Sequence, residues 1–237
     1  MTGKPPTHAF VYPNRRHWWS AFGARGAMVG LLLAVTVVIT PSADAATRPS
    51  ASPAALVPRP FNVESTLKAD LDGDGDLDVV LVGVDGPAVL PETQEGDNAD
   101  GIRVLVVARK DAEGYRRVGL GPDALECRRC GGAFWGGLSA PVELATMGGG
   151  FTTAQSAGAR EITDWTHRYR IENGRVRLIG LDIVNTDRGD GSVVARSTNL
   201  LTGVTITTVE GQPQVPVKAG RVKGKPRVVY LESVKLG

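Results

Sequence analysis

Residues 163–181 read TDWTHRYRIENGRVRLIGL and carry the clearest fold signal in the chain. Every second residue from Trp165 to Ile171 is aromatic, His or aliphatic, which is typical of a β-strand with one buried face. A second apolar segment follows at residues 175–181. Asn173 and Gly174, which lie between the two segments, favour the positive φ angles of a tight hairpin turn. The stretch therefore predicts two antiparallel strands.

Short β-branched runs recur through the rest of the chain. Residues 79–84 (VVLVGV) and 102–108 (IRVLVVA) are the continuous apolar runs expected of buried strands. Residues 110–114 (KDAEG) are typical of a hairpin loop, and further strands are expected at 192–196, 203–209 and 227–234. No long amphipathic helix is predicted, and the 30 glycines suit a chain rich in turns and bulges. We therefore predict a mainly β fold, an antiparallel sheet that forms a sandwich or an open barrel.

Residues 1–45 have the pattern of a secretory signal peptide with a signal helix. Arg15, Arg16 and Arg25 precede an apolar run at residues 27–40, and Ala43-Asp44-Ala45 offers a cleavage site. A retained membrane anchor is the alternative, which the length disfavours because the run has about 14 residues and about 20 are needed to cross a bilayer. The pattern predicts a periplasmic or secreted protein, exported by the Sec route or, given Arg15-Arg16, by the twin-arginine route.

The chain after the signal divides into a linker and one domain. Residues 46–60 (ATRPSASPAALVPRP) alternate Pro with small residues, which indicates an extended linker. Residues 61–237 are expected to form a single β domain. The formal charge of +2 becomes −1 without residues 1–45, which hold four basic residues and one acid. Such a balance argues against nucleic-acid or membrane binding driven by net charge, and no membrane span is expected after signal cleavage.

An acidic loop provides the strongest functional signal. Residues 69–81 read ADLDGDGDLDVVL. Five carboxylates at this density repel one another, and Ca²⁺ would relieve the repulsion by taking about six to eight oxygen ligands. The spacing matches the start of an EF-hand loop, with Gly75 at the sharp turn. However, Leu81 stands where a bidentate Glu belongs, and a strand rather than a helix follows. The alternative is a solvated acidic turn that binds nothing tightly.

This loop resembles the D-x-D-x-D-G-x-x-D loop of FG-GAP and VCBS-type repeats, in which a calcium loop leads directly into a β-strand. The resemblance implies Ca²⁺ as the cofactor. It implies side-chain ligands from Asp70, Asp72, Asp74 and Asp78 and a backbone oxygen from Asp76. Repeats of this family usually occur in tandem and build a propeller. Because the loop occurs once here, a propeller is the minor alternative.

The chain after the signal also resembles a group of small exported bacterial proteins with one Asp-rich loop. The shared features are the Asp loop, the CRRCGG segment at residues 127–132, the strand at 165–169, the LIG segment at 178–180 and NLLTG at 199–203. The sequence departs from the group at residues 133–135, where AFW replaces a Gly-Asp-Pro type continuation. No activity comes with the group, so the resemblance implies architecture alone.

Cys127 and Cys130 leave three interpretations open. A local disulfide is the default for an exported protein. A zinc site needs about four ligands, and His167 is the one histidine left after signal removal. Thioredoxin-like redox chemistry needs a C-x-x-C motif at the start of a helix. Gly131-Gly132 oppose a helix here, which argues against this chemistry. Arg128-Arg129, however, could lower the pKa of a neighbouring thiol.

Other candidate residues have ordinary structural explanations. His167 is expected to be a packed strand histidine rather than a general base, and Arg188-Gly189-Asp190 a turn rather than an adhesion motif. Asp182 and Asp187 could be a glycosidase pair, although acidic residues between strands are common. A longer acidic loop at residues 85–101 could lend a ligand to the calcium site or be solvated. Its acids are Glu92, Glu95, Asp97 and Asp100.

Together these patterns favour an exported, non-catalytic Ca²⁺-binding β-domain protein in which the ion is structural. The role that fits best is a binding module of the cell envelope, with a protein or another envelope component as its partner. The alternative is an envelope thiol-disulfide oxidoreductase that uses Cys127 and Cys130. The sequence contains no Gly-x-Ser-x-Gly motif, so it gives no support for a serine hydrolase of that kind.

Overall fold

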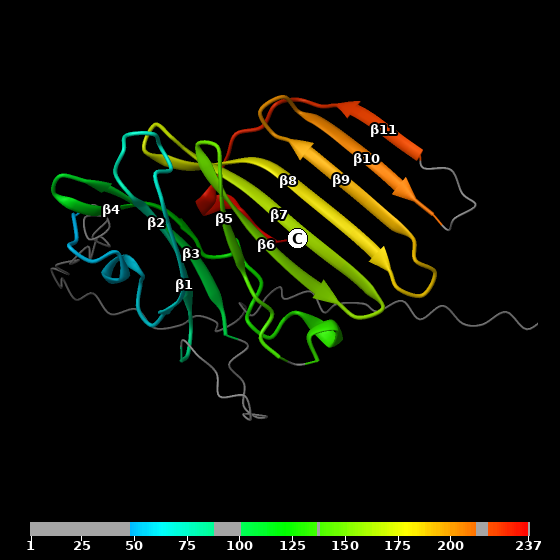
Figure 1. Ribbon diagram of the computed structural model, residues 1–237, viewed down its shortest axis with the longest axis horizontal. Coiled ribbons are helices and arrows are strands. Elements are labelled where there is room, and N and C mark those ends of the chain that lie inside the picture. Colours follow the sequence, from blue (N-terminus) through cyan, green and yellow to red (C-terminus); the bar gives the residue numbers. More distant parts are fainter. Residues whose placement is uncertain (1–47, 88–100, 137, 212–217, 237) are drawn as a thin grey trace, which may run out of the picture. The chain divides into compact units, whose positions relative to one another are not determined.

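Antiparallel strands dominate the computed structural model, which describes residues 48–87, 101–136, 138–211 and 218–236 (Figure 1). The predicted signal peptide, residues 1–45, lies outside the described residues. None of the helices in the described part of the chain is long and apolar enough to cross a bilayer.

The first sheet has four antiparallel strands in sequence order. They are β1 (Asn62–Ala69), β2 (Asp78–Val84), β3 (Arg103–Asp111) and β4 (Gly114–Gly121). Every residue of β2 is buried, as are Arg103–Ala108 in β3. The two continuous apolar runs predicted as buried strands are therefore confirmed, and β2 and β3 form the centre of this sheet.

The second sheet is larger and is also ordered along the sequence, from β5 to β11. Its strands are β5 (Glu143–Met147), β6 (Gly150–Gly158), β7 (Glu161–Glu172), β8 (Arg175–Asp187), β9 (Val193–Asn199), β10 (Val204–Glu210) and β11 (Lys218–Lys223), with β12 (Val229–Tyr230) paired to β8. The hairpin predicted from residues 163–181 is the β7–β8 pair. Asn173 (φ 52°) and Gly174 (φ 70°) both adopt the expected positive φ at its turn.

The core lies between the two sheets. Val80, Val82, Leu105 and Val107 of the first sheet pack in one cluster with side chains of the second. The second sheet contributes Phe151, Tyr169, Ile171, Val176 and Leu178. The stacked rings of Phe151 and Tyr169, with centroids 5.0 Å apart, lie in this cluster. The mainly β, sandwich-like fold predicted from the sequence is confirmed, and the described strands form open sheets rather than a closed barrel.

The prediction of a strand at residues 227–234 is largely wrong. Only Val229 and Tyr230 pair as a strand, and a 3-10 helix, Leu231–Ser233, follows. This turn places Leu231 and Val234 in the core, with exposed fractions of 0% and 3%. The apolar residues that suggested a strand instead form a short turn whose side chains fill one part of the core.

Residues 50–57 contact the first sheet, although they lie within the segment predicted as a linker. Ser50 pairs with Tyr115 of β4 through two backbone hydrogen bonds of 2.8 Å. The 3-10 helix Pro53–Leu56 follows, and Leu56 and Val57 are buried. Val57 packs with Val79, Leu81 and Val104 on the face of the first sheet away from the main core.

Candidate metal centre

The Asp-rich loop connects β1 to β2, and its two ends are held together by strand pairing. Ala69 lies opposite Asp78 at the last position of the β1–β2 ladder. Gly73 (φ 85°) and Gly75 (φ 91°) adopt left-handed conformations between these ends. Because a side chain at a positive φ is strained, glycine at these two positions lets the loop turn twice within a few residues.

The loop is organised around its own carboxylates. The two oxygens of Asp70 accept hydrogen bonds from the backbone N–H groups of Gly73 (2.7 Å) and Gly75 (3.1 Å). Asp72 accepts from the N–H of Asp74, and Asp74 accepts from that of Asp76. The chain therefore wraps around the Asp70 carboxylate and keeps the acidic side chains close together.

Asp78 is the buried member of the loop, with an exposed fraction of 0%. Its Oδ2 accepts from the N–H of Leu71 (3.1 Å) and its Oδ1 from the N–H of Lys110 (2.9 Å). Burial raises the pKa of Asp78 above its ordinary value; the two backbone hydrogen bonds oppose this shift, and the charges of Asp72 and Asp74 add to it. Negative charge at this position therefore has an energetic cost that a bound cation would reduce.

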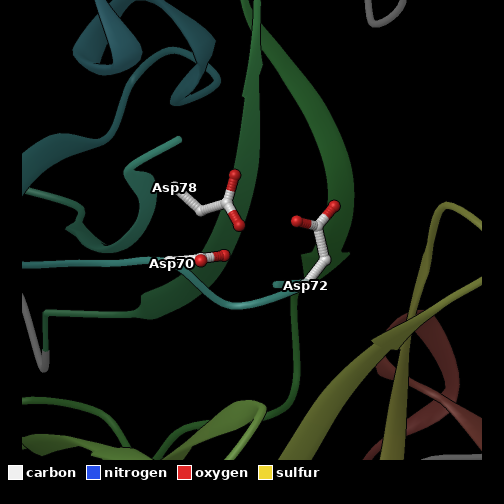
Figure 2. A group of neighbouring side chains, drawn as sticks. All are labelled: Asp70, Asp72 and Asp78. Carbon is white, nitrogen blue, oxygen red and sulfur yellow. The ribbon is translucent and has the colours of Figure 1, made fainter. Parts of the chain in front are cut away.

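Three carboxylates converge from the two ends of the loop (Figure 2). One oxygen from each of Asp70, Asp72 and Asp78 lies within 4.8 Å of the others, so this group could hold a metal ion. Carboxylate oxygens fit a hard cation such as Ca²⁺ better than zinc, which prefers nitrogen and sulfur. Within the described residues this is the one such group of three or more His, Cys, Asp or Glu side chains.

Asp74 and Asp76 lie outside this group of three and face basic side chains of β3. Arg109 Nε lies 3.4 Å from Asp72 Oδ2 and 3.9 Å from Asp74 Oδ2. Lys110 Nζ lies 3.8 Å from Asp76 Oδ1. Sequence reasoning missed both cations, because only the β2–β3 pairing brings residues 109–110 to the loop. Their position directly after the buried run at 102–108 was the sole hint.

Cys127 and Cys130 form a disulfide with Cα atoms 5.1 Å apart. The 3-10 helix Gly132–Trp135 follows, not an α-helix. Arg128, between the two cysteines, is buried and contacts Glu64 (3.2 Å) and the carbonyl of Pro87 (2.7 Å). This arginine therefore fastens the cysteine turn to β1 through Glu64, a contact that the sequence did not indicate.

His167 is a buried strand residue, as the sequence predicts. Its exposed fraction is 4%, and it lies opposite Thr153 of β6. Burial lowers the pKa of His167 from 6.5 to about 4. The imidazole is therefore neutral at physiological pH and packs near Tyr169, with ring centroids 6.1 Å apart.

The remaining candidates do not form a catalytic site in the described residues. Asp182 pairs with Arg168 and Asp187 with Arg160, and the odd spacing of the two acids on β8 puts them on opposite faces. Residues 188–190 form a turn between β8 and β9, as predicted. Glu92, Glu95, Asp97 and Asp100 lie outside the described residues.

No family model, no curated protein and no solved structure matches this chain. We therefore infer function from the site residues themselves.

Proposed function

We propose that this chain is an exported, non-catalytic β-domain protein whose loop at residues 70–78 binds Ca²⁺ as a structural ion. The observation that carries the proposal is the convergence of the carboxylates of Asp70, Asp72 and Asp78 within 4.8 Å, one of them buried. Carboxylates this close repel one another, and a bound Ca²⁺ would relieve the repulsion.

Calcium is the ion that fits this arrangement best. The three candidate side chains offer only oxygen, and the loop can add a backbone oxygen at Asp76, as the resemblance to FG-GAP and VCBS-type loops implies. Ca²⁺ accepts irregular sets of about six to eight oxygens, whereas Mg²⁺ demands a near-octahedral arrangement. A three-carboxylate loop completed by carbonyl oxygens and water suits the larger ion.

A structural role follows from where the loop lies. Asp78 joins the loop to the N–H of Lys110 at the end of β3, so the loop contacts all three of the first strands. An ion that draws the carboxylates together would stabilise this end of the first sheet.

The proposed export rests on the signal-like residues 1–45 and agrees with a disulfide at Cys127–Cys130. The proposed role as a binding module of the cell envelope agrees with the broad second sheet, whose strands β9–β11 contact mainly β8 and one another. The alternative, a thiol-disulfide oxidoreductase, draws on the exposure of Cys130. The lack of an α-helix after the motif disfavours it.

Calorimetric titration of the mature protein with CaCl₂ tests the calcium proposal. We expect saturable heat for the wild type and a large loss of affinity for Asp72→Asn. Asp123→Asn, which removes an exposed acid far from the loop in sequence, is the matched control and should bind as the wild type does. The proposal fails if millimolar Ca²⁺ gives no heat, or if Asp72→Asn binds as tightly as the control.

A further inference from the structure

A second polar site lies across the strands of the large sheet. Strand pairing aligns Arg168, Gly180, Asn199, Val204 and Lys223 in one row from β7 to β11. The adjacent row contains Asp182, Ser197, Ile206 and Arg221. Because directly opposed residues point to the same face of a sheet, these side chains share one surface.

This surface is hollowed into a groove of about 660 Å³. Among the residues that line it are Arg168, Ser197, Asn199, Ile206, Arg221 and Lys223. Gly180 lies beneath Arg168, since a Cβ at position 180 would come within 2.5 Å of Arg168 Nε. The glycine therefore lets the guanidinium lie flat across the sheet, where it pairs with Asp182 through Nη2 at 3.0 Å.

The groups that this groove offers are mainly hydrogen-bond donors. Asn199 Oδ1 accepts from the backbone N–H groups of Leu201 and Thr202, both at 3.0 Å, so the amide NH₂ of Asn199 remains to donate. Arg221 and Lys223 are exposed, and no carboxylate of the described residues lies within 4.0 Å of either. A groove with charged donors and few acceptors is suited to an anionic ligand.

Basic residues are concentrated in and directly after β11, which borders the groove. Residues 218–227 (KAGRVKGKPR) contain five basic residues and no acid, and residues 219–228 are all exposed. Elsewhere in the described residues many arginines are paired, as Arg103 is with Glu64 and Arg177 with Glu172. The described residues thus carry an unbalanced basic segment at residues 218–227, and Arg221 and Lys223 of this segment line the groove.

We propose that this groove binds an acidic saccharide, a sugar chain that carries carboxylate groups. Arg221 and Lys223 would contact the acid groups, and the side chains of Ser197 and Asn199 would hydrogen-bond to hydroxyls. The half-exposed aliphatic side chains of Val204 and Ile206 offer a surface for the apolar faces of sugar rings. The inference rests on the proposed binding role but uses none of the calcium loop.

Other anionic partners fit the groove less well. Nucleic-acid bases stack on aromatic side chains, and among the described residues no aromatic side chain lines the groove. A peptide added to the edge of β11 would run along that strand, whereas the polar rows run across five strands. A further alternative is that Lys and Arg on the edge strand β11 only prevent unwanted strand pairing. In that case the groove would bind no ligand.

The test is titration of the mature protein with a trigalacturonate, monitored by calorimetry or NMR shifts. We expect saturable binding that weakens with salt, and roughly tenfold or greater weakening in Arg221→Gln/Lys223→Gln, the loss expected for charge-assisted hydrogen bonds. Ser197→Trp, which fills the groove without changing charge, should also abolish binding. The charge-matched control Arg59→Gln/Lys235→Gln should bind as the wild type does.

Comparison ligands decide the class of partner. Maltotriose, which has no acid groups, should bind at least about tenfold more weakly than the trigalacturonate. No saturable binding, equal binding of maltotriose, or tighter binding of a DNA oligonucleotide, polyphosphate or anionic vesicles would overturn the proposal. Unchanged binding by Ser197→Trp would do so as well. A Ca²⁺ titration of the same sample separates the two proposals: if calcium binds and the saccharide does not, only the saccharide inference fails.

Discussion

The carboxylate of Asp78 and the backbone N–H of Lys110 are joined by a 2.9 Å hydrogen bond that spans 32 residues of sequence. The other oxygen of Asp78 accepts from Leu71, so one buried side chain connects the Asp-rich loop to the end of β3. Asp78 is thus both a candidate metal ligand and a residue that holds the loop against the first sheet. The two roles can be separated by experiment.

Asp78→Asn should destabilise the protein even without metal. The amide keeps the shape of the carboxylate, but its NH₂ cannot accept a hydrogen bond, so either the buried N–H of Leu71 or the part-buried N–H of Lys110 loses its partner. We expect a loss of about 1–3 kcal/mol in the free energy of unfolding, measured by urea denaturation in EDTA. Asp76→Asn, at a more exposed acid of the same loop, should change it by less than about 0.5 kcal/mol. Equal effects of the two variants would contradict the structural role of Asp78.

Calcium should stabilise the wild type against heat by mass action. At free Ca²⁺ about 100 times the dissociation constant, the added stability is about 2.7 kcal/mol. The melting temperature should rise with CaCl₂ and return after EDTA, with a much smaller rise in Asp70→Asn. A melting temperature insensitive to both reagents would refute a structural ion.

Arg109→Gln should strengthen calcium binding. The guanidinium lies 3.4 Å from Asp72 Oδ2 and competes with an incoming cation for that carboxylate. Exposed ion pairs contribute up to about 1 kcal/mol, so we expect roughly two- to fivefold tighter binding by calorimetry. Arg116→Gln serves as the control, since Arg116 pairs with Asp111 and Glu113. Weaker binding in Arg109→Gln would show that the arginine supports the site.

His167 should make stability fall as the pH is lowered. Its pKa is about 4 in the folded protein and near 6.5 when exposed, so the unfolded chain binds the extra proton between these values. The contribution is fully present above pH 6.5 and is lost as the pH falls toward 4, for a total of about 3 kcal/mol. His167→Gln should flatten this part of the stability curve relative to the wild type, measured by urea denaturation at several pH values. Parallel curves for the two proteins would show that His167 is not the titrating group.

Reduction of the Cys127–Cys130 disulfide should cost little stability. The bond closes a very short loop, for which the chain-entropy estimate is about 2 kcal/mol. Cys127→Ser/Cys130→Ser should therefore remain folded, and the wild type should show no turnover in an insulin-reduction assay. Sustained turnover that the double variant lacks would favour the oxidoreductase alternative.

The sequence alone was sufficient to predict the features that depend on residues adjacent to one another in the chain. Alternation around Tyr169, the Asn173-Gly174 turn and the apolar run of β2 predicted strands and hairpin because side-chain period and turn conformation are local properties. The same holds for the acidic loop, whose spacing is read directly from residues 70–78.

Contacts between distant segments could not be predicted from one sequence. Arg103 is the charged residue within the run at 102–108, and it is only 1% exposed because Glu64 of β1 pairs with it at 2.6 Å. Arg109 approaches the acidic loop only because of the β2–β3 register. The basic groove likewise depends on a row of residues taken from five strands, which no local pattern reveals.

The order of the strands has a consequence for how the chain can fold. From β6 to β11 each strand pairs with the one just before it, so the sheet can grow by successive hairpins at a small loop-closure cost. The exception is β12, where Val229 pairs with Leu178 of β8 and the next turn seats Leu231 in the core. During synthesis from the N-terminus, the strands of both sheets can therefore pair before the core between them is complete. The core is completed only when residues 229–234 have been added.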